Sequence, residues 1–586
     1  MIVGTTREEK QEAAKFENGN AGFAGKMMTG AQIFVRCLLD EGVDTIFGYP
    51  GGVVLSVYDE LYKHPELRHI FIRHEQGGTH AADGYARATG KPGVILVTSG
   101  PGATNTVTGI ATAFMDSIPL VVFTGQVPTS LMGNDAFQEA DTMGITQPIT
   151  KHSFLVKHVE ELPETIHKAF HIATTGRPGP VVIDLPKDML LSKTEYYPAK
   201  DREVEIRGYK PVSKGNPRQV KKAAEMLAAS KRPVLYAGGG AILSNANVEL
   251  TAIAHRLKAP VTTTLQGLGA FPETDPLSLG MLGMHGTWYA NMAMQEADLI
   301  VAIGSRFDDR VTGRLDGFAP KAQIIHIDID PTCIGKNVEA DLPIVGDVKE
   351  VLTELMPHVE PCDSAEWLKT IDQWKAEHPL RFKKDPNVIK PQEVVQQLSE
   401  LTRGEAIISV DVGQHQMWAA QYYKFTQPRS WLSSGGLGTM GYGFPAAMGA
   451  QVACPDRTVI AIVGDGGFQM TSGELATAVA YKIPVKIVIV NNGYLGMVRQ
   501  WQELFFENRY SHVELGSTNP DFVKYAESFG AKAFRATTHA EMRDVFQKMM
   551  AEKELPVLVD VQVAREENCY PMVPAGAALH EMVEGE

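Results

Sequence analysis

Two polar residues, Asp465 and Asn492, follow apolar runs in a pattern that suits a cation and a phosphorylated ligand. The run from Thr458 to Val463 stops at Asp465 between glycines, and the run from Val485 to Val490 stops before Asn492. Such β-branched runs predict buried parallel strands joined by a crossover helix, whose carboxyl ends meet at one sheet edge. A carboxylate and an amide oxygen suit Mg²⁺, and the glycines allow close approach of a diphosphate. The alternative is a pair of ordinary strand-end turns.

A second candidate for chemistry is Glu75, which follows the short apolar run Ile70 to Ile72. This position predicts the end of a strand that leads into a helix, where a carboxylic acid can serve proton transfer. The alternative is a glutamate that stabilises a helix start through the helix dipole. The neighbouring His74 and His80 are six residues apart rather than four, so they do not form a zinc-protease motif.

Length and composition indicate an ordinary multidomain protein. The chain has 586 residues, with 44% hydrophobic and 21% charged residues, which favours three or four globular domains. Its 55 basic and 69 acidic residues give a net charge of −14, which argues against a nucleic-acid or anionic-membrane partner. The five cysteines form no CxxC motif, and no apolar run is long enough to span a membrane. Residues 1–26 lack the features of a targeting signal, so we expect a flexible extension on a cytoplasmic protein.

The elements that must position these residues fall into three α/β blocks. We predict three doubly wound parallel-sheet domains, with the first and third alike in size and architecture. Their predicted bounds are residues 27–190, 218–357 and 391–564, separated by linkers over 191–217 and 358–390 and followed by a tail over 565–586. In the middle block, Pro233 to Ala241 is a strand that runs into a glycine cluster, but it lacks the dinucleotide fingerprint and is a weak nucleotide-binding candidate. In the tail, Pro571 to Pro574 either packs over a site or lies on the surface.

Longer motifs make a family resemblance specific. The first block contains YPGG, HEQ, TSGPGATN, DAFQEAD and GRPGPVVIDLPKD, and the third contains VGQHQMWAAQ, SSGGLGTMGYGFPAA, GDGG, NN and LGMVRQWQ. Together they resemble the large, catalytic subunit of the acetohydroxyacid (acetolactate) synthases, which are thiamine diphosphate enzymes. The resemblance covers roughly Met28 to Val583. It implies a pyrimidine-binding first domain, an FAD-binding middle domain and a diphosphate-binding third domain.

The resemblance also implies roles for individual residues. Glu75 would activate the cofactor through its aminopyrimidine ring, Met440 would hold it in a V shape, and Gly52 and Gln138 would face the reacting centre. The metal ligands would be Asp465, Asn492 and the carbonyl of Tyr494. Other thiamine diphosphate contacts would be Gln414, His415, Gly438, Thr439, Gly466, Gly467, Leu495, Gly496 and Met497. The FAD contacts would be Arg177, Gly239, Thr264, Leu265, Gly283, Met284, His285, Gly304, Arg306, Asp308, Arg310, Asp328, Ile329, Asp347 and Val348.

A substrate channel would contain Phe137, Lys187, Arg310 and Trp501, with Trp501 favouring a second keto acid that is one methylene longer. For Met440 and Trp501 the alternative is core packing, and for Arg310 it is an ion pair with Asp308 or Asp309.

The implied reaction is decarboxylation of pyruvate and ligation of its two-carbon unit to pyruvate or 2-oxobutanoate, giving 2-acetolactate or 2-aceto-2-hydroxybutyrate for valine, leucine and isoleucine. FAD would then be structural, since no net redox step occurs. Two alternatives stay open: a thiamine- and FAD-dependent pyruvate oxidase, and a catalytically silent nucleotide-binding or regulatory relative. Glyoxylate carboligase is disfavoured because Glu75 is present. The implied partners are a second copy in a homodimer or tetramer with shared sites, and a small regulatory subunit.

Overall fold

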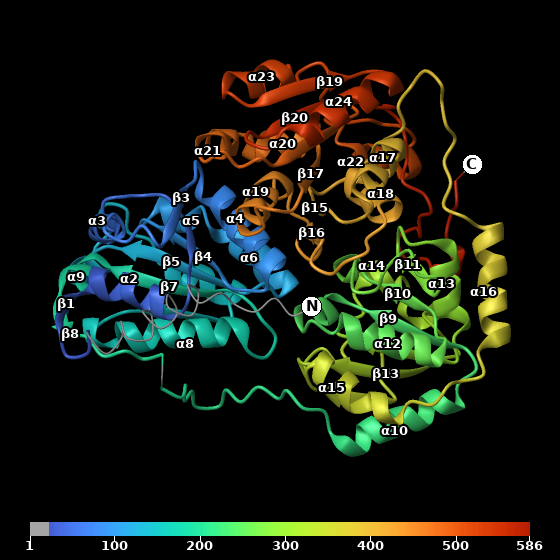
Figure 1. The fold of residues 1–586 in the computed structure, drawn as a ribbon, viewed down its shortest axis with the longest axis horizontal. Coiled ribbons are helices and arrows are strands. Elements are labelled where there is room, and N and C mark those ends of the chain that lie inside the picture. Colours follow the sequence, from blue (N-terminus) through green and yellow to red (C-terminus); the bar gives the residue numbers. More distant parts are fainter. Residues whose placement is uncertain (1–22, 201, 586) are drawn as a thin grey trace, which may run out of the picture. The chain divides into compact units, whose positions relative to one another are not determined.

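The computed structural model of the chain describes residues 23–200 and 202–585 and contains two compact units. Unit 1 comprises Met1–Asp83 and Pro92–Tyr209, and unit 2 comprises Gly84–Lys91 and Lys210–Glu586. Unit 1 holds one six-stranded parallel sheet and unit 2 holds two, each flanked by helices (Figure 1). The predicted class of three doubly wound α/β domains is therefore confirmed. Of the N-terminal extension, residues 1–22 lie outside the described residues. Within the described residues, no helix has the length and hydropathy needed to cross a membrane.

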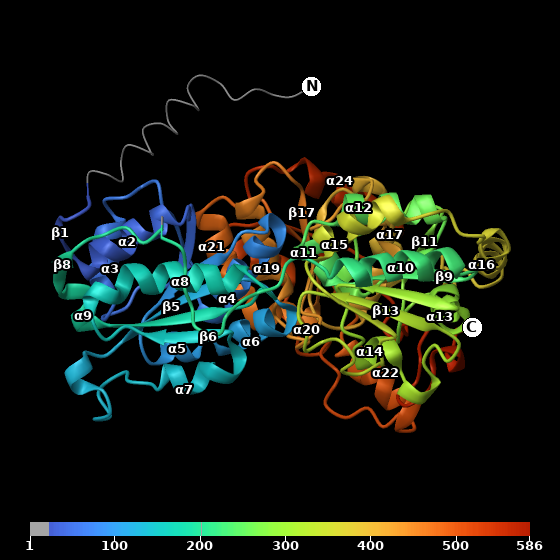
Figure 2. The same cartoon turned by 90° about the horizontal axis from the view of Figure 1, so that it is seen from below.

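The sheet of unit 1 has the strand order β3-β2-β4-β5-β7-β6. A short antiparallel ladder, β1 (Met27–Thr29) with β8 (Lys193–Glu195), joins the start of this unit to the predicted first linker. Helices α2, α3, α8 and α9 pack together on one face of the sheet, and α5, α6 and α7 on the other (Figure 2). The strands are β2 (Thr45–Gly48), β3 (Arg68–Phe71), β4 (Gly93–Val97), β5 (Leu120–Gln126), β6 (His152–Leu155) and β7 (Val181–Pro186). The helices are α2 (Gly30–Asp40), α3 (Leu55–Leu61), α4 (Glu75–Thr89), α5 (Pro101–Thr104), α6 (Val107–Asp116), α7 (Thr142–Thr146), α8 (Leu162–Thr174) and α9 (Lys187–Leu191). The part of α4 from Gly84 onward is assigned to unit 2.

The first sheet of unit 2 has the order β11-β10-β9-β12-β13-β14. Counted along this domain the order is 3-2-1-4-5-6, the arrangement typical of dinucleotide-binding folds. Alternate residues of each strand face two separate cores: in β12, Leu299, Val301 and Ile303 pack on one side, and Ile300 and Ala302 on the other. The strands are β9 (Pro233–Ala237), β10 (Val261–Thr263), β11 (Ser278–Met281), β12 (Leu299–Ile303), β13 (Gln323–Asp328) and β14 (Leu342–Val345). The helices are α10 (Pro217–Ala229), α11 (Gly239–Leu243), α12 (Asn247–Leu257), α13 (Trp288–Glu296), α14 (Asp309–Thr312) and α15 (Val348–Leu355).

The second sheet of unit 2 has the order β16-β15-β17-β18-β20-β19. Numbered within its own domain this is 2-1-3-4-6-5, the same order as in unit 1, so the predicted likeness of the first and third blocks extends to their topology. Helices α17, α18 and α24 bury their apolar faces in one core with this sheet. The strands are β15 (Ile407–Val410), β16 (Trp431–Ser433), β17 (Val459–Gly464), β18 (Lys486–Asn491), β19 (Lys532–Ala536) and β20 (Val557–Gln562). The helices are α17 (Pro391–Thr402), α18 (Gln414–Tyr422), α19 (Gly443–Ala453), α20 (Asp465–Thr471), α21 (Leu475–Ala480), α22 (Gly496–Phe505), α23 (Phe522–Ser528) and α24 (His539–Ala551).

Two segments beyond the predicted middle domain complete its core. The stretch predicted as a linker over 358–390 contains helix α16 (Ala365–Glu377), whose Trp367 and Ile371 pack in the same cluster as α13. The C-terminal tail returns to that cluster with Val573 and Leu579, and the Val573 N–H donates to the Met284 carbonyl at 2.8 Å. Pro571 to Pro574 does not lie on the surface, because Met572 and Val573 are buried, and Val573 packs in the core of the middle domain. That it packs over the site stays a prediction.

Candidate active site

A cavity opens at the carboxyl ends of β15, β17 and β18 in unit 2. It has about 530 Å³ of empty space, part of it open to solvent. It lies where the strand order reverses between β15 and β17, the position at which open α/β sheets bind ligands. Residues that had been predicted as cofactor contacts line most of it: Gln414, His415, Met440, Asp465, Gly466, Gly467, Asn492, Tyr494, Leu495, Gly496 and Met497. Gly438 and Thr439 belong to the same loop as Met440. Sequence reasoning missed the lining residues Val412, Gly413, Trp418, Gly464, Val490 and Val498.

Among the described residues that line this cavity, Asp465 is the one carboxylate. It is the first residue of α20 and is 1% exposed, and burial raises its pKa to about 6. One oxygen, Oδ2, accepts a hydrogen bond from Asn519 Nδ2 at 2.7 Å, and no ion pair involves Asp465 within the described part of the chain. A buried carboxylate with no cationic partner is costly, and a bound cation would offset that cost.

Asn492 follows β18 and lies in the same wall. Its Oδ1 accepts a hydrogen bond from the Tyr494 N–H at 3.1 Å, and its Nδ2 donates to Gln414 Oε1 at 3.4 Å. An amide oxygen keeps a second lone pair, so Asn492 can still bind a metal. With one carboxylate, one amide oxygen and a main-chain carbonyl, the donor set fits Mg²⁺, which binds few protein ligands.

Neighbouring side chains approach two glycines of this site so closely that a Cβ atom at either position would collide with them. A Cβ on Gly467 would lie 1.9 Å from Asp411 Oδ2, and one on Gly496 would lie 2.1 Å from Gln414 Oε1. Asp411 itself is fully buried at the end of β15, and burial raises its pKa to about 7. Its Oδ1 accepts hydrogen bonds from the Val412 N–H at 3.0 Å and the Gly441 N–H at 2.7 Å, which fixes the loop that carries Met440.

Two buried side chains in the cavity wall have unsatisfied polar atoms. Burial lowers the pKa of His415 to about 4, so its imidazole is neutral at pH 7, and Nε2 has no hydrogen-bond partner within the described residues. Trp418 Nε1 is also buried without a partner in that part of the chain. A polar ligand in the cavity would satisfy such groups.

The predicted reactive residues of unit 1 gather around the ends of β3 and β4. Glu75 begins α4, and its Oε2 accepts a hydrogen bond from Asn105 Nδ2 at 2.9 Å. A Cβ on Gly102 would lie 3.6 Å from Glu75 Oε1, so the 98–102 turn contacts the carboxyl group. The same turn contacts Gln138, whose φ is +61°, because a Cβ on Gly100 would lie 2.8 Å from its carbonyl oxygen. Sequence reasoning assigned no role to Asn105, although it lies in a quoted motif.

The remaining predicted residues of unit 1 lie at its surface or in helix ends. Gly52 is exposed with open space at its Cα, Phe137 is 88% exposed, and Lys187 is the first residue of α9. The Arg177 Nε donates to Ser117 Oγ at 2.7 Å. In unit 2, Trp501 lies on α22 beside Phe505, with ring centroids 5.8 Å apart.

The FAD residues predicted in unit 2 follow the carboxyl ends of the strands of the middle sheet. Gly239, Thr264, Gly283, Gly304, Asp328 and Asp347 come after or end β9, β10, β11, β12, β13 and β14, respectively. The Arg306 guanidinium is half-buried at this edge, and its charge opposes the rise that burial causes in the pKa of Asp308. A guanidinium at this edge could also bind a phosphate-bearing ligand. Arg310 is exposed, and its Nε lies 3.7 Å from Asp309 Oδ2, so the ion-pair alternative for this residue has a structural basis. Asp347 already caps α15 through bonds from the Lys349 and Glu350 N–H groups.

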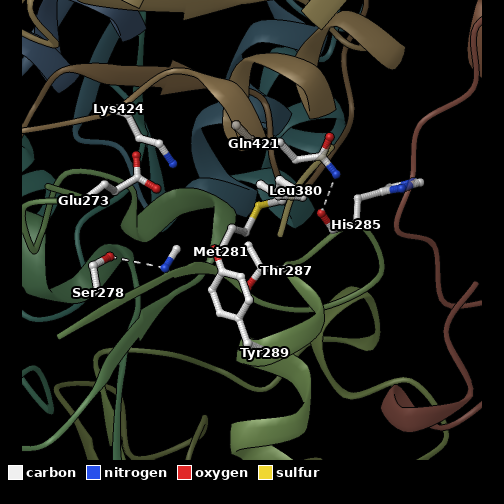
Figure 3. A pocket seen from close by; sticks show the side chains of 11 residues that line it. Glu273, Ser278, Met281, His285, Thr287, Tyr289, Leu380, Gln421 and Lys424 are labelled. Carbon is white, nitrogen blue, oxygen red and sulfur yellow. Dashed lines mark hydrogen bonds between the residues drawn. The ribbon is translucent and has the colours of Figure 1, made fainter. Parts of the chain in front are cut away.

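A second pocket lies where β11 and α13 meet α18, and encloses about 350 Å³ (Figure 3). Glu273 is its acidic residue, and its main-chain N–H donates to the Phe425 carbonyl at 2.9 Å, while the Phe425 N–H donates to Glu273 Oε2 at 2.8 Å. Burial raises the pKa of Glu273 to about 7, although the nearby Lys424 opposes that rise. Nearby, Gln421 Nε2 donates to the His285 carbonyl at 2.9 Å. These bonds join the middle and third domains, so the pocket is primarily a structural junction.

Comparison with known proteins identifies the family. Three family models match: "Thiamine pyrophosphate enzyme, N-terminal TPP binding domain" over residues 28–145, the "central domain" over 220–355 and the "C-terminal TPP binding domain" over 411–561. The chain is similar to "Acetolactate synthase large subunit" of Haemophilus influenzae, with 50% identity over 564 residues, 95% of this chain and 98% of that protein. It is 49% identical to "Acetolactate synthase isozyme 3 large subunit" of Escherichia coli, over 95% of this chain and 98% of that protein. It is 53% identical to "Probable acetolactate synthase large subunit" of Methanocaldococcus jannaschii, over 95% of each chain. The chain therefore belongs to the acetolactate synthase large-subunit family of thiamine pyrophosphate enzymes.

Proposed function

We propose that this chain is the catalytic subunit of an acetolactate synthase, which condenses pyruvate with a second 2-keto acid in branched-chain amino acid biosynthesis. The observation that carries the proposal is the cavity lined by Asp465 and Asn492, at the point where the strand order of the third sheet reverses. The sequence of the chain is 50% identical to that of a named acetolactate synthase large subunit. The substrates are pyruvate and either pyruvate or 2-oxobutanoate.

The third domain binds the charged end of the cofactor. When bound, thiamine diphosphate supplies a nucleophilic carbon for attack on the keto group of pyruvate and accepts the electrons released as CO₂ leaves. Asp465, Asn492 and the Tyr494 carbonyl would hold Mg²⁺, whose charge would offset that of the diphosphate. His415 would line the same site, where its buried Nε2 is left for a hydrogen-bond donor on the cofactor, and Met440 is held in the cavity wall through the bond from the Gly441 N–H to Asp411.

Glu75 would be the acid that exchanges a proton with the bound cofactor. Its Oε2 accepts a hydrogen bond from Asn105, which leaves Oε1 for that exchange. Gln138 and Gly52 face the reacting carbon. By the family resemblance, Phe137, Lys187 and Arg310 would contribute to the substrate channel, and Trp501 would contact the side chain of the second keto acid.

The middle domain binds FAD as a structural group. Support comes from its 3-2-1-4-5-6 strand order and from the half-buried cation of Arg306 at the carboxyl edge. The reaction transfers a carbon unit without net oxidation, so FAD has no redox task in it.

The products of the purified protein test this function. The protein is incubated with thiamine diphosphate, Mg²⁺ and FAD, and given pyruvate alone or pyruvate with 2-oxobutanoate. We expect 2-acetolactate in the first case and added 2-aceto-2-hydroxybutyrate in the second. Oxygen uptake or quinone reduction in step with pyruvate loss would indicate a pyruvate oxidase instead. Absence of both products and of Mg²⁺-dependent thiamine diphosphate binding would indicate a silent relative.

The working assembly is a homodimer or a dimer of dimers, with a small regulatory subunit as a further partner. Glu75 and Asp465 lie in different units of the chain, and one cofactor must contact both, so we propose sites shared between two copies. Glu75→Gln and Asp465→Ala proteins, each inactive alone, are mixed under conditions of subunit exchange. In a mixed dimer with shared sites, one site carries both changes and the other carries neither, so activity should reappear. Failure to recover activity despite exchange shown by differently tagged subunits would refute shared sites.

A further inference from the structure

The segment Val513–Asn519 wraps around the turn that carries two of the proposed metal ligands. The Leu495 N–H donates to the Val513 carbonyl at 2.8 Å, and the Leu515 and Gly516 N–H groups donate to the Gly493 carbonyl at 2.8 and 3.0 Å. Gly493 lies between Asn492 and Tyr494. Main-chain bonds therefore fix the segment against the Asn492 side of the site.

The same segment reaches the other strand end through Asn519. Its main-chain N–H donates to the Leu515 carbonyl at 2.9 Å, which holds Asn519 at the base of a tight turn. Its side-chain Nδ2 donates to Asp465 Oδ2 at 2.7 Å. Gln469, one turn along α20 from Asp465, donates from Nε2 to Asn519 Oδ1 at 2.9 Å and to the Asp465 carbonyl at 3.0 Å. Asn519 is thus oriented at its oxygen and donates from its nitrogen.

The chain beyond this segment is anchored as well. Asp521 accepts a hydrogen bond from Arg535 at 2.7 Å, and Arg535 also donates to the buried Asp560 at 3.0 Å. Asp560 in turn accepts from Asn491, the residue before Asn492, at 2.9 Å. Residues 513–521 therefore connect to both strand ends of the site through separate bonds.

We infer that Asn519 is a positioning residue that sets the orientation of the Asp465 carboxylate, occupying Oδ2 so that Oδ1 is the oxygen presented to Mg²⁺. This inference rests on the proposed function, because it takes Asp465 as a metal ligand. The physical reason is that a carboxylate binding Mg²⁺ through one oxygen needs a donor for the other, and an amide supplies one without a competing charge. The main-chain N–H groups of Asp465 and Gly466 also donate to this carboxylate, so the loss of Asn519 removes one of the groups that restrain it, and each binding event must then supply that restraint.

The test measures how much Mg²⁺ is needed for thiamine diphosphate to bind, so it does not depend on turnover. Thiamine diphosphate binding to the full-length protein is followed by titration calorimetry over a series of Mg²⁺ concentrations. The main variant is Asn519→Leu, which keeps the side-chain size and removes both hydrogen bonds. Ser517→Ala is the matched control, since this exposed side chain on the same segment bonds only to Glu514.

We expect Asn519→Leu to raise the Mg²⁺ concentration for half-maximal cofactor binding by about 10-fold or more, as for other partners of metal ligands. Excess Mg²⁺ should restore binding, and the melting temperature without metal should match that of Ser517→Ala. An unchanged Mg²⁺ requirement overturns the inference while leaving the proposed function intact. If the unaltered protein binds thiamine diphosphate equally well with and without Mg²⁺, the metal site of the proposed function is refuted instead.

A second variant covers a folding defect in Asn519→Leu. Gln469→Ala alters an exposed side chain, so the fold should tolerate it. It removes the bond that orients Asn519 together with a bond to the Asp465 main-chain carbonyl, and leaves the Asp465 carboxylate and its bond from Asn519 in place. A raised Mg²⁺ requirement in this variant supports the inference. An unchanged requirement in Gln469→Ala, where Asn519→Leu does not fold, overturns it.

Discussion

Replacement of Gly467 by alanine should disrupt cofactor binding through a collision that the structure makes explicit. A Cβ at this position would lie 1.9 Å from Asp411 Oδ2, about 1.1 Å inside the 3.0 Å below which real Cβ contacts essentially never fall. Asp411 cannot turn away freely, because its Oδ1 holds the Val412 and Gly441 N–H groups. The displacement must therefore pass to the Met440 loop or to the start of α20, which carries Asp465.

The size of the effect follows from the cost of overpacking. Added methyl groups in well-packed sites cost about 1–3 kcal/mol. If this strain is present only when the site has its binding geometry, the strain energy is subtracted from the binding free energy. Thiamine diphosphate affinity then falls by about 5- to 150-fold, because each 1.4 kcal/mol changes a dissociation constant tenfold. Gly473→Ala is the matched control, since no heavy atom lies within 4 Å of its added Cβ and its φ is not in the left-handed region.

Affinity is measured by titrating thiamine diphosphate into each protein at saturating Mg²⁺ and following tryptophan fluorescence, for which Trp418 in the cavity wall is a natural reporter. Gly473→Ala should bind like the unaltered protein. If Gly467→Ala also binds within about twofold of it, the close approach to Asp411 does not control the site geometry.

Three further changes probe other parts of the chain. Glu75→Gln should leave Mg²⁺-dependent cofactor binding intact but slow deuterium exchange at the reactive carbon of the cofactor by about 100-fold or more, and near-normal exchange by NMR would remove Glu75 from its role. Glu273→Gln should change the melting temperature little at pH 5 and raise it at pH 8. The folded pKa of about 7 exceeds the ordinary 4.5, so the folded state binds more protons in this window and loses up to about 3 kcal/mol as pH rises, a loss that glutamine avoids. An equal shift at both pH values would contradict this reasoning. Trp501→Leu should reduce the preference for 2-oxobutanoate over pyruvate by about 10-fold while sparing acetolactate formation, and an unchanged product ratio in competition would count against it.

Sequence patterns located the strands of the fold well because buried parallel strands leave a strong local signal. The predicted runs ending before Asp465 and Asn492 correspond to β17 and β18, and Glu75 begins α4 directly after β3 as expected. The reversal of strand order between β15 and β17 could not be read locally, since it depends on pairing between distant segments. The 3-2-1-4-5-6 order of the middle sheet likewise depends on pairing between distant strands. The local signal for a dinucleotide-binding fold is a glycine fingerprint, which this chain lacks.

The supporting residues of the site were the hardest to predict. Asn519 is 54 residues from Asp465 in the sequence, in a stretch with no recognisable motif, and its role depends on a turn that only the main-chain bonds to Gly493 define. Asp411 follows a strand as many structural residues do, and only its contact with Gly467 distinguishes it. Trp418 follows His415 by three residues, which places both on one side of α18, so helical spacing could have indicated it.

The way the middle domain is completed has consequences for recombination of these enzymes. Its core takes Trp367 and Ile371 from α16 and Val573 and Leu579 from the extreme C-terminal region, so the folding module is discontinuous in the gene. A fragment cut at residues 218–357 would expose the apolar face of α13. Chimaeras that exchange this domain between relatives should therefore carry α16 and the tail with it, and a crossover point placed just before Arg565 would separate residues that fold together.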